Sequence, residues 1–150
     1  MTEALLKLKA KDAEDVQVIS AVLQDAIAPV CDMTYNADDK NFIMVVHRLR
    51  REAPTDMGLE RICCAVNVRD VTSVQTHGID LSQQGRMLDL LAVMQDDKAL
   101  IFIFAGNAQI RLQPSNCSMF IEDFGEAWPA QCNPCHEEVS EVRLQETKSR

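Results

Sequence analysis

The sequence has few aromatic side chains and fewer bases than acids. Only 5% of its 150 residues are aromatic, and 15 lysines and arginines stand against 23 aspartates and glutamates, for a formal net charge of −8. Proteins that bind nucleic acids hold phosphates with clustered basic side chains and stack bases on aromatic rings. The composition therefore argues against a dedicated nucleic-acid-binding protein.

Long apolar runs are also missing. The longest, residues 99–106, is far shorter than the ~18 residues of a transmembrane helix. The first residues interleave Lys7, Lys9 and Lys11 with short apolar stretches and lack the apolar run of about 7–15 residues that a signal peptide needs. We therefore expect a cytoplasmic protein with no membrane partner. Cytosolic thiols are reduced, so the six cysteines are not interpreted as a disulfide framework.

The common motifs of catalysis and nucleotide binding do not occur. The sequence has no G-x-S-x-G nucleophile elbow, no G-x-x-x-x-G-K phosphate loop, no H-E-x-x-H and no G-x-G-x-x-G. Its three histidines are scattered along the chain. The sequence thus favours a protein that is not an enzyme, and it predicts no catalytic residue and no cofactor.

The first clear structural signal in the sequence is an amphipathic helix of roughly four turns. Asp12 is a suitable N-cap, and Pro29 marks the end of the pattern. The apolar residues recur at spacings of three and four: Val16, Ile19, Leu23 and Ile27. Such a helix must lie on an apolar surface.

The residue pattern of the rest of the chain predicts mainly strands. A short first strand is expected within residues 3–11, and the later candidates are residues 30–36, 42–47, 61–74, 87–94, 99–105 and 108–113. Gly106 and Asn107 suit a two-residue hairpin turn. A C-terminal helix is predicted from spacings of three, four and seven among Cys117, Phe120, Ile121 and Phe124.

This order predicts an α+β fold. Its antiparallel sheet of six to seven strands would curl into a barrel-like roll that resembles the pleckstrin-homology type, with an N-terminal amphipathic helix and a C-terminal helix. We expect a single domain over residues 1–128, followed by a polar, flexible tail over residues 129–150.

Several predicted strands are apolar on both faces. In residues 99–105, Leu100, Phe102 and Phe104 share one face while Ile101 and Ile103 share the other. Residues 42–46 and 62–66 behave similarly. One helix ~10 Å wide covers about two strands. We therefore expect an apolar strand face to pair with another chain, most simply as a homodimer. Strands lying partly under loops or under the first strand are the alternative.

One cysteine motif could carry chemistry. Cys132, Cys135 and His136 match C-x-x-C-H, the attachment pattern of c-type haem. Attachment takes place outside the cytosol, however, and no export signal is visible. A zinc site could use the same three residues with Cys117, but structural zinc sites usually present two ligand pairs. The plain interpretation is a terminal segment with free thiols, and no metal ligand is assigned.

Two further polar clusters could carry chemistry. Arg48, Arg50 and Arg51 could hold a phosphate or carboxylate, or they could pair with Glu52 and Glu60 at the end of a strand. His77 and Asp80 could act together in acid–base chemistry, since a carboxylate can orient an imidazole. Three residues apart at a glycine turn, such residues more often stabilise the turn itself.

A family resemblance rests on six stretches of the chain. They are residues 6–15, 19–26, 74–80, 88–93, 103–112 and 124–128. Together they resemble the uncharacterised proteobacterial domain-of-unknown-function family 2948, over roughly residues 5–136. The resemblance implies one small cytoplasmic domain without a known cofactor or assigned activity. Cys132 and Cys135 depart from that family's Pro- and Arg-rich ending, which makes haem or zinc a less natural shared function.

The sequence as a whole favours a non-catalytic binding or protein-interaction domain that associates with itself and with another protein. A metal or redox protein using Cys132, Cys135 and His136 is one alternative. A small anion-binding protein or enzyme using the arginine cluster is the other.

Overall fold

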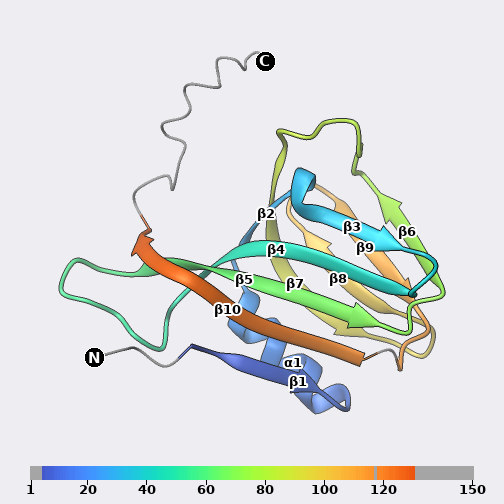
Figure 1. The fold of residues 1–150 in the computed structure, drawn as a ribbon, viewed down its shortest axis with the longest axis horizontal. Helices are drawn as coiled ribbons and strands as arrows, with labels where there is room; N and C mark the ends of the chain where they lie inside the picture. Colours follow the sequence, from blue (N-terminus) through green and yellow to red (C-terminus); the bar gives the residue numbers. More distant parts are fainter. Residues whose placement is uncertain (1–4, 117, 131–150) are drawn as a thin grey trace.

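The computed structural model describes residues 5–116 and 118–130 (Figure 1). One α-helix, α1 (Ala13–Leu23), and one short 3-10 helix, η1 (Val30–Asp32), occur in this part of the chain. The strands are β1 (Lys7–Ala10), β2 (Ile27–Pro29), β3 (Met33–Asn36), β4 (Asn41–Leu49), β5 (Glu60–Arg69), β6 (Ser73–His77), β7 (Met87–Gln95), β8 (Leu100–Phe104), β9 (Ala108–Gln113) and β10 (Ser118–Pro129).

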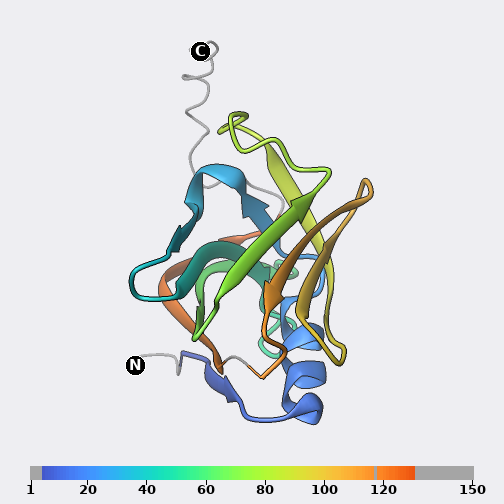
Figure 2. The same cartoon turned by 90° about the vertical axis from the view of Figure 1, so that its right-hand side faces the viewer.

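All ten strands belong to one sheet, with the order β1-β10-β5-β4-β2-β7-β8-β9-β6 and with β3 beside β4. Every pairing is antiparallel. The short β2 joins two halves, because Ile27 pairs with both His47 of β4 and Asp89 of β7. Figure 2 shows the two halves facing each other, with α1 toward the bottom of the view.

The expected fold class is wrong in three respects. The sheet has ten strands rather than six or seven, the described residues contain one α-helix rather than two, and the sheet does not close into a barrel-like roll, since β1 and β6 end the strand order without pairing with each other. Part of the undercount comes from β2, which has only three residues, and from β5 and β6, which the single strand expected over residues 61–74 runs together.

The predicted C-terminal helix is a strand. In β10, Met119, Ile121 and Asp123 are buried while their neighbours are more exposed, which is the alternation of a strand with one face in the core. Phe120 and Phe124 lie on the other face. The helical spacing arose because both faces of this strand carry apolar residues. Cys117, which contributed to the prediction, lies outside the described residues.

The N-terminal helix is confirmed, although it is shorter than expected. Asp12 caps it by accepting a hydrogen bond from the Asp15 backbone N–H at 2.9 Å. It ends at Leu23, because Asp25 takes a φ of 70° and donates its N–H to the Leu90 carbonyl at 2.7 Å. The chain then continues as β2 instead of as a last helical turn.

The core lies between the two halves of the sheet. Phe42 of β4 and Phe102 of β8 meet there with ring centroids 6.3 Å apart. The buried residues of α1, Val16, Ile19 and Leu23, belong to the same apolar cluster. The helix therefore faces the interior of the fold and does not cover the outer side of the sheet. No helix within the described residues is long and apolar enough to cross a membrane.

Candidate functional site

A buried ion pair joins two strands that are not neighbours in the sheet. Arg48 of β4 and Asp123 of β10 flank β5, and their side chains are 1% and 2% exposed. The guanidinium donates through Nε to Oδ1 at 2.8 Å and through Nη2 to Oδ2 at 2.6 Å. Asp123 also accepts the Leu6 backbone N–H at 3.1 Å. This geometry satisfies both charged groups inside the fold.

Glu52 completes this cluster from the connection between β4 and β5. Its two carboxylate oxygens accept hydrogen bonds from Arg48 at 3.1 and 2.7 Å. Burial by itself lowers the pKa of Arg48, but the hydrogen bonds to Asp123 and Glu52 outweigh burial and raise the pKa above its usual range. Arg48 is therefore a permanent cation that fixes two carboxylates.

Cys64 lies beside this cluster, opposite Asp123 in the pairing of β5 with β10. Burial, reinforced by the nearby Asp123 carboxylate, raises the pKa of the Cys64 thiol to about 12. Nucleophilic catalysis requires a thiolate. The buried cluster thus has the properties of a structural clamp rather than of a catalytic centre.

The hydrogen bond from Arg48 lowers the pKa of Glu52. A lowered pKa in the folded state contributes stability that is present above the unfolded pKa and disappears as the pH falls through the folded one. We expect Glu52→Gln to flatten the fall in stability between about pH 5 and pH 3. Urea unfolding curves at several pH values, followed by the fluorescence of Trp128, measure this. An unchanged pH dependence in the variant would refute the assignment.

The other arginines of the predicted cluster also bond within the fold. Arg50 reaches Glu60 at 3.3 Å, and Arg51 reaches the Asp25 carboxylate at 2.7 Å. Arg51 also donates to the Gln24 carbonyl at 3.0 Å, where α1 ends. The pairing with Glu52 and Glu60 considered from the sequence is present, but Arg48 and Arg50 are buried rather than solvated. These groups do not form an open anion site.

The structure does not bring His77 and Asp80 together as an acid–base pair. Asp80 accepts hydrogen bonds from the backbone N–H and the hydroxyl of Ser82, at 3.0 and 2.6 Å, and these bonds lower its pKa. His77 ends β6, where it pairs with Gln109. The Gly78 carbonyl between them accepts a hydrogen bond from Arg86 at 2.8 Å. The segment is a hydrogen-bonded turn.

The cysteine motif cannot be placed. Cys132, Cys135 and His136 lie outside the described residues, as does Cys117. Within residues 5–116 and 118–130, no group of three or more histidine, cysteine, aspartate or glutamate side chains could hold a metal ion.

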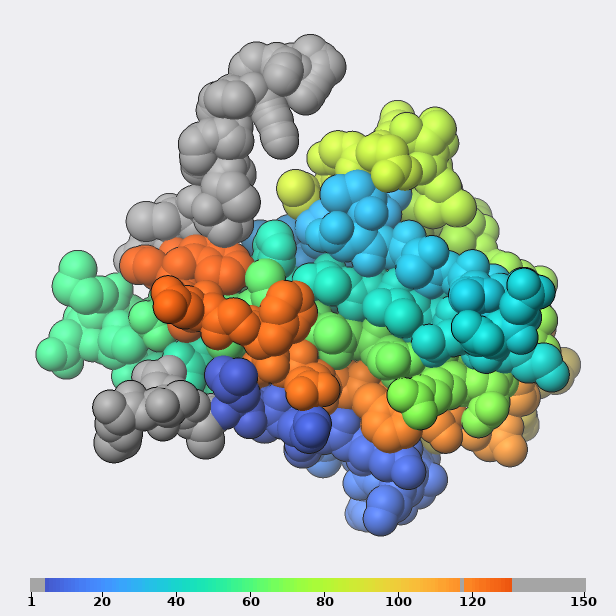
Figure 3. Space-filling model, in the orientation of Figure 1, coloured from blue at the N-terminus to red at the C-terminus, as the bar shows by residue number. Residues whose placement is uncertain are grey.

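The candidate binding surfaces lie on two outer faces of the sheet. The first, here called the β5 face, is formed by the outward side chains of β1, β10, β5 and β4, and Figure 3 shows it from the front. Across the strands, the register sets Lys9, Phe120, Asn67 and Ile43 in one row and Phe124, Cys63 and His47 in another. No described helix or strand lies over this face (Figure 1).

Trp128 lies at the far end of the β5 face, where its ring meets that of His47 edge-on at 5.4 Å. Burial, opposed by the charge of Asp32 and aided by that of Arg61, lowers the pKa of His47. The Trp128 indole N–H and the Asn67 side-chain oxygen are both buried without a hydrogen-bond partner among the described residues. Because of the helix misassignment, sequence reasoning did not place Phe120, Phe124 and Trp128 on an exposed sheet face.

The second outer face, here called the β7 face, belongs to the other half of the sheet. Met87, Leu91 and Met94 of β7 are 57%, 44% and 49% exposed. Met94 pairs with Ile101 of β8, and Ala92 pairs with Ile103. Ile101 and Ile103 are the residues that the alternation predicted to lie opposite Phe102; Ile103 is half-buried, whereas Ile101 is only 8% exposed.

The chain was compared with known protein families, curated proteins and solved structures. No curated protein and no solved structure matches it. One family model, described as "Protein of unknown function (DUF2948)", matches residues 6–136, which is the family that the sequence resembled. Because the match covers most of the chain, this protein belongs to the DUF2948 family.

Proposed function

We propose that this protein is a non-catalytic protein-interaction domain that forms a homodimer through the β7 face. The observation that carries the proposal is the row of exposed apolar side chains on β7, from Met87 through Leu91 to Met94. Large apolar side chains that gather on one surface are typical of interaction sites. Methionine adapts well to such surfaces because its side chain is flexible and polarisable.

The charges around the β7 face are compatible with pairing of two identical surfaces. Arg111 of β9, on the same outer side, lies 3.7 Å from Asp96, so opposite charges meet there. In a symmetric dimer, each face meets its own copy and like charges would face each other. The face also carries exposed Asp89, between Met87 and Leu91, so Arg111 against Asp89 and Asp96 gives 1 − 2 = −1 and the repulsion between two copies is small.

The polar groups of the described residues support a non-catalytic role. Cys64 is buried with a raised pKa, and Arg48 is committed to Asp123 and Glu52. Asp80 is bonded to Ser82 rather than to a histidine. Cys64 and Asp123 lie side by side, but both are buried and the raised pKa keeps the thiol protonated, so this pair does not supply the thiolate that nucleophilic catalysis needs. The proposal also includes the expected location in the cytoplasm of a bacterial cell.

Sedimentation velocity of the full chain over a range of concentrations tests the dimer. We expect the wild-type protein to dimerise and the Leu91→Lys/Met94→Lys variant to be monomeric. Each substitution occurs twice in a symmetric interface, and burial of one such side chain contributes about 1.5–3 kcal/mol. The dissociation constant should therefore rise by at least about 100-fold.

Phe124→Lys is the matched control. Phe124 is 44% exposed, as Leu91 is, but it lies on the β5 face. This variant should dimerise like the wild type. A wild-type chain that is monomeric at every concentration, or equal weakening by the substitutions on the two faces, would refute the proposed interface.

A further inference from the structure

Two cations on the β5 face share one aromatic ring. The Lys9 ammonium lies 5.2 Å from the centroid of the Phe120 ring, and the Arg69 guanidinium carbon lies 5.0 Å from it. Both distances are within cation–π range. Neither cation forms an ion pair with a carboxylate in the part of the chain that the structure describes. The ring holds both charges at the surface without neutralising them.

The β5 face as a whole is basic, although the protein is acidic. Its outward charged side chains are Lys7, Lys9, Arg61, Arg69 and Glu122. Four bases and one acid give 4 − 1 = +3, or +2 with Glu126, which is exposed in the irregular part of β10, whereas the whole chain carries −8. Lys7 and Glu122 partly neutralise each other at 3.7 Å. The positive charge is therefore concentrated on one surface, near Lys9 and Arg69.

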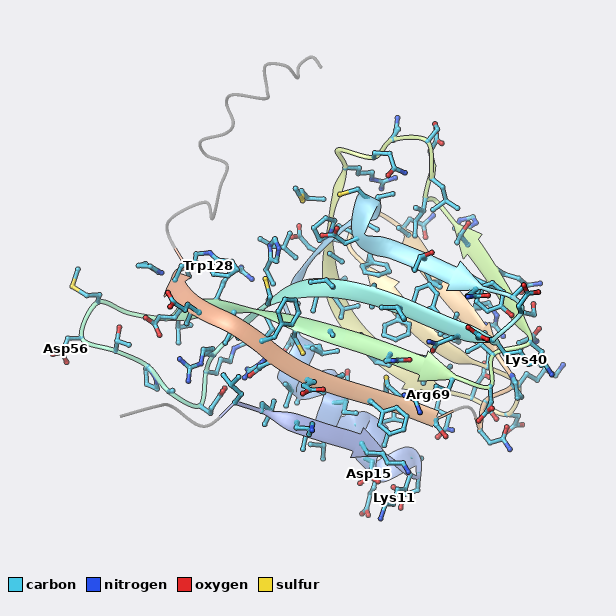
Figure 4. The ribbon with its side chains drawn as sticks, in the orientation of Figure 1. Lys11, Asp15, Lys40, Asp56, Arg69 and Trp128 are labelled. Atoms are coloured by element: carbon cyan, nitrogen blue, oxygen red, sulfur yellow. The ribbon has the colours of Figure 1, made fainter. Side chains whose placement is uncertain are left out.

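Apolar side chains continue this face beyond the cations. Ile43 pairs with Asn67, Val45 pairs with Ala65, and Phe124 follows on β10. Figure 4 places Arg69 and Trp128 at opposite ends of the same surface. β5 has ten residues, which corresponds to about 33 Å at ~3.3 Å per residue. The surface suits a ligand of similar length that is anionic at one end and apolar along the remainder.

We infer that the β5 face binds an acidic segment of a partner protein, with carboxylates at Lys9 and Arg69 and apolar side chains over Ile43, Val45 and Phe124. Charge complementarity specifies this occupant. A nucleic acid fits less well, because it carries charge along its whole length. On this face the two cations beside the Phe120 ring lie at one end, whereas Arg61 at the other end donates to the backbone carbonyls of Asp25 and His47. A second copy that met the same face would bring together two surfaces that both carry a net positive charge.

This binding goes beyond the proposed homodimer, because it uses the outer side of the other half of the sheet. Fluorescence anisotropy with a labelled peptide of about ten residues, with glutamates at one end and valines along the remainder, tests it. We expect the full-length protein to bind this peptide, and the affinity to fall as salt rises. Lys9→Gln and Arg69→Gln should each weaken binding by about tenfold. Lys98→Gln, which makes the same charge change in the turn between β7 and β8, should leave binding unchanged.

Two further probes distinguish the alternatives. A peptide with lysines in place of the glutamates should not bind, and an oligothymidylate of similar length should bind more weakly than the acidic peptide. Equal binding of both peptides, tighter binding of the oligothymidylate, or equal effects of the Lys9 and Lys98 substitutions would overturn the inference. The sedimentation result with Leu91→Lys/Met94→Lys is independent of all three, so either proposal can fail while the other stands.

Discussion

Replacing Arg48 with methionine is expected to lower the free energy of unfolding by about 3–5 kcal/mol. The substitution keeps an unbranched side chain in the core but leaves the Asp123 carboxylate buried without its cation. Breaking one side of a buried ion pair is costly because the remaining charge has lost both its water and its partner. Urea unfolding, followed by far-UV circular dichroism and by the fluorescence of Trp128, measures the change.

The Arg48→Met/Asp123→Leu double variant separates the ion pair from the packing around it. Removing both charges should recover most of the lost stability, because apolar replacements of a buried pair are often nearly neutral. The recovery should fall short by about 1 kcal/mol, since the Leu6 N–H then loses its acceptor at Asp123. A double variant as unstable as Arg48→Met would show that the guanidinium acts mainly through its shape.

The clamp explains how distant segments come together. Arg48 and Asp123 are 75 residues apart in the chain, and Glu52 belongs to the connection between β4 and β5. Asp123 also holds the segment before β1 through the Leu6 backbone. One buried cation therefore organises two strands, one connection and the N-terminal end of the described fold.

Features that depend on local chemistry could be predicted from the sequence. The N-cap at Asp12 needs only the Asp15 N–H three residues later. The Gly106–Asn107 turn needs two residues that tolerate positive φ, and both adopt it, at 81° and 61°. Nearby residues were likewise enough to predict the turn between β3 and β4 and the strands β7, β8 and β9.

The nature of β10 could not be predicted in this way. A carboxylate within an apolar run favours a solvated helix face unless a buried partner is known, and Arg48 lies far away in the sequence. The same limit applies to the arginine cluster. Sequence neighbours of Arg51 suggest an exposed strand end, whereas its carboxylate partner is Asp25, which follows α1. Long-range pairing decides both cases, and one sequence does not reveal it.

The apolar strand faces are an intermediate case. Alternation correctly placed Ile101 and Ile103 opposite Phe102. It could not say where α1 would pack, and the expectation that this helix would cover part of the outer side does not hold, since Val16 and Ile19 lie in the interior cluster. Two outer faces are left for partners, and they differ in charge. Apolar residues alternate in the same way on both faces, so the alternation alone does not distinguish them. The difference in charge does, and the two binding proposals rest on it.

A second large loss of stability is expected at Gly78, where the backbone passes close to that of Asn107. Gly78 follows β6 with a φ of 72°, and a Cβ added there would lie 2.5 Å from the Asn107 carbonyl oxygen. Gly78→Ala therefore combines left-handed backbone strain with a clash against another backbone segment. Each effect costs about 1–3 kcal/mol. We expect a loss of about 3–4 kcal/mol in the free energy of unfolding, measured by urea denaturation.

Two other glycines separate these causes. Gly106 has a φ of 81° but open space around its added Cβ, so Gly106→Ala should cost only about 1–2 kcal/mol, from backbone strain alone. Gly85 has open space and no positive φ, so Gly85→Ala should leave stability within about 0.5 kcal/mol of the wild type. If Gly78→Ala and Gly106→Ala lower the free energy of unfolding by the same amount, the clash of the added Cβ with the Asn107 carbonyl oxygen adds no cost of its own. The turn after β6 would then be free to move away from the β8–β9 turn, and Gly78 would be required for its backbone conformation alone.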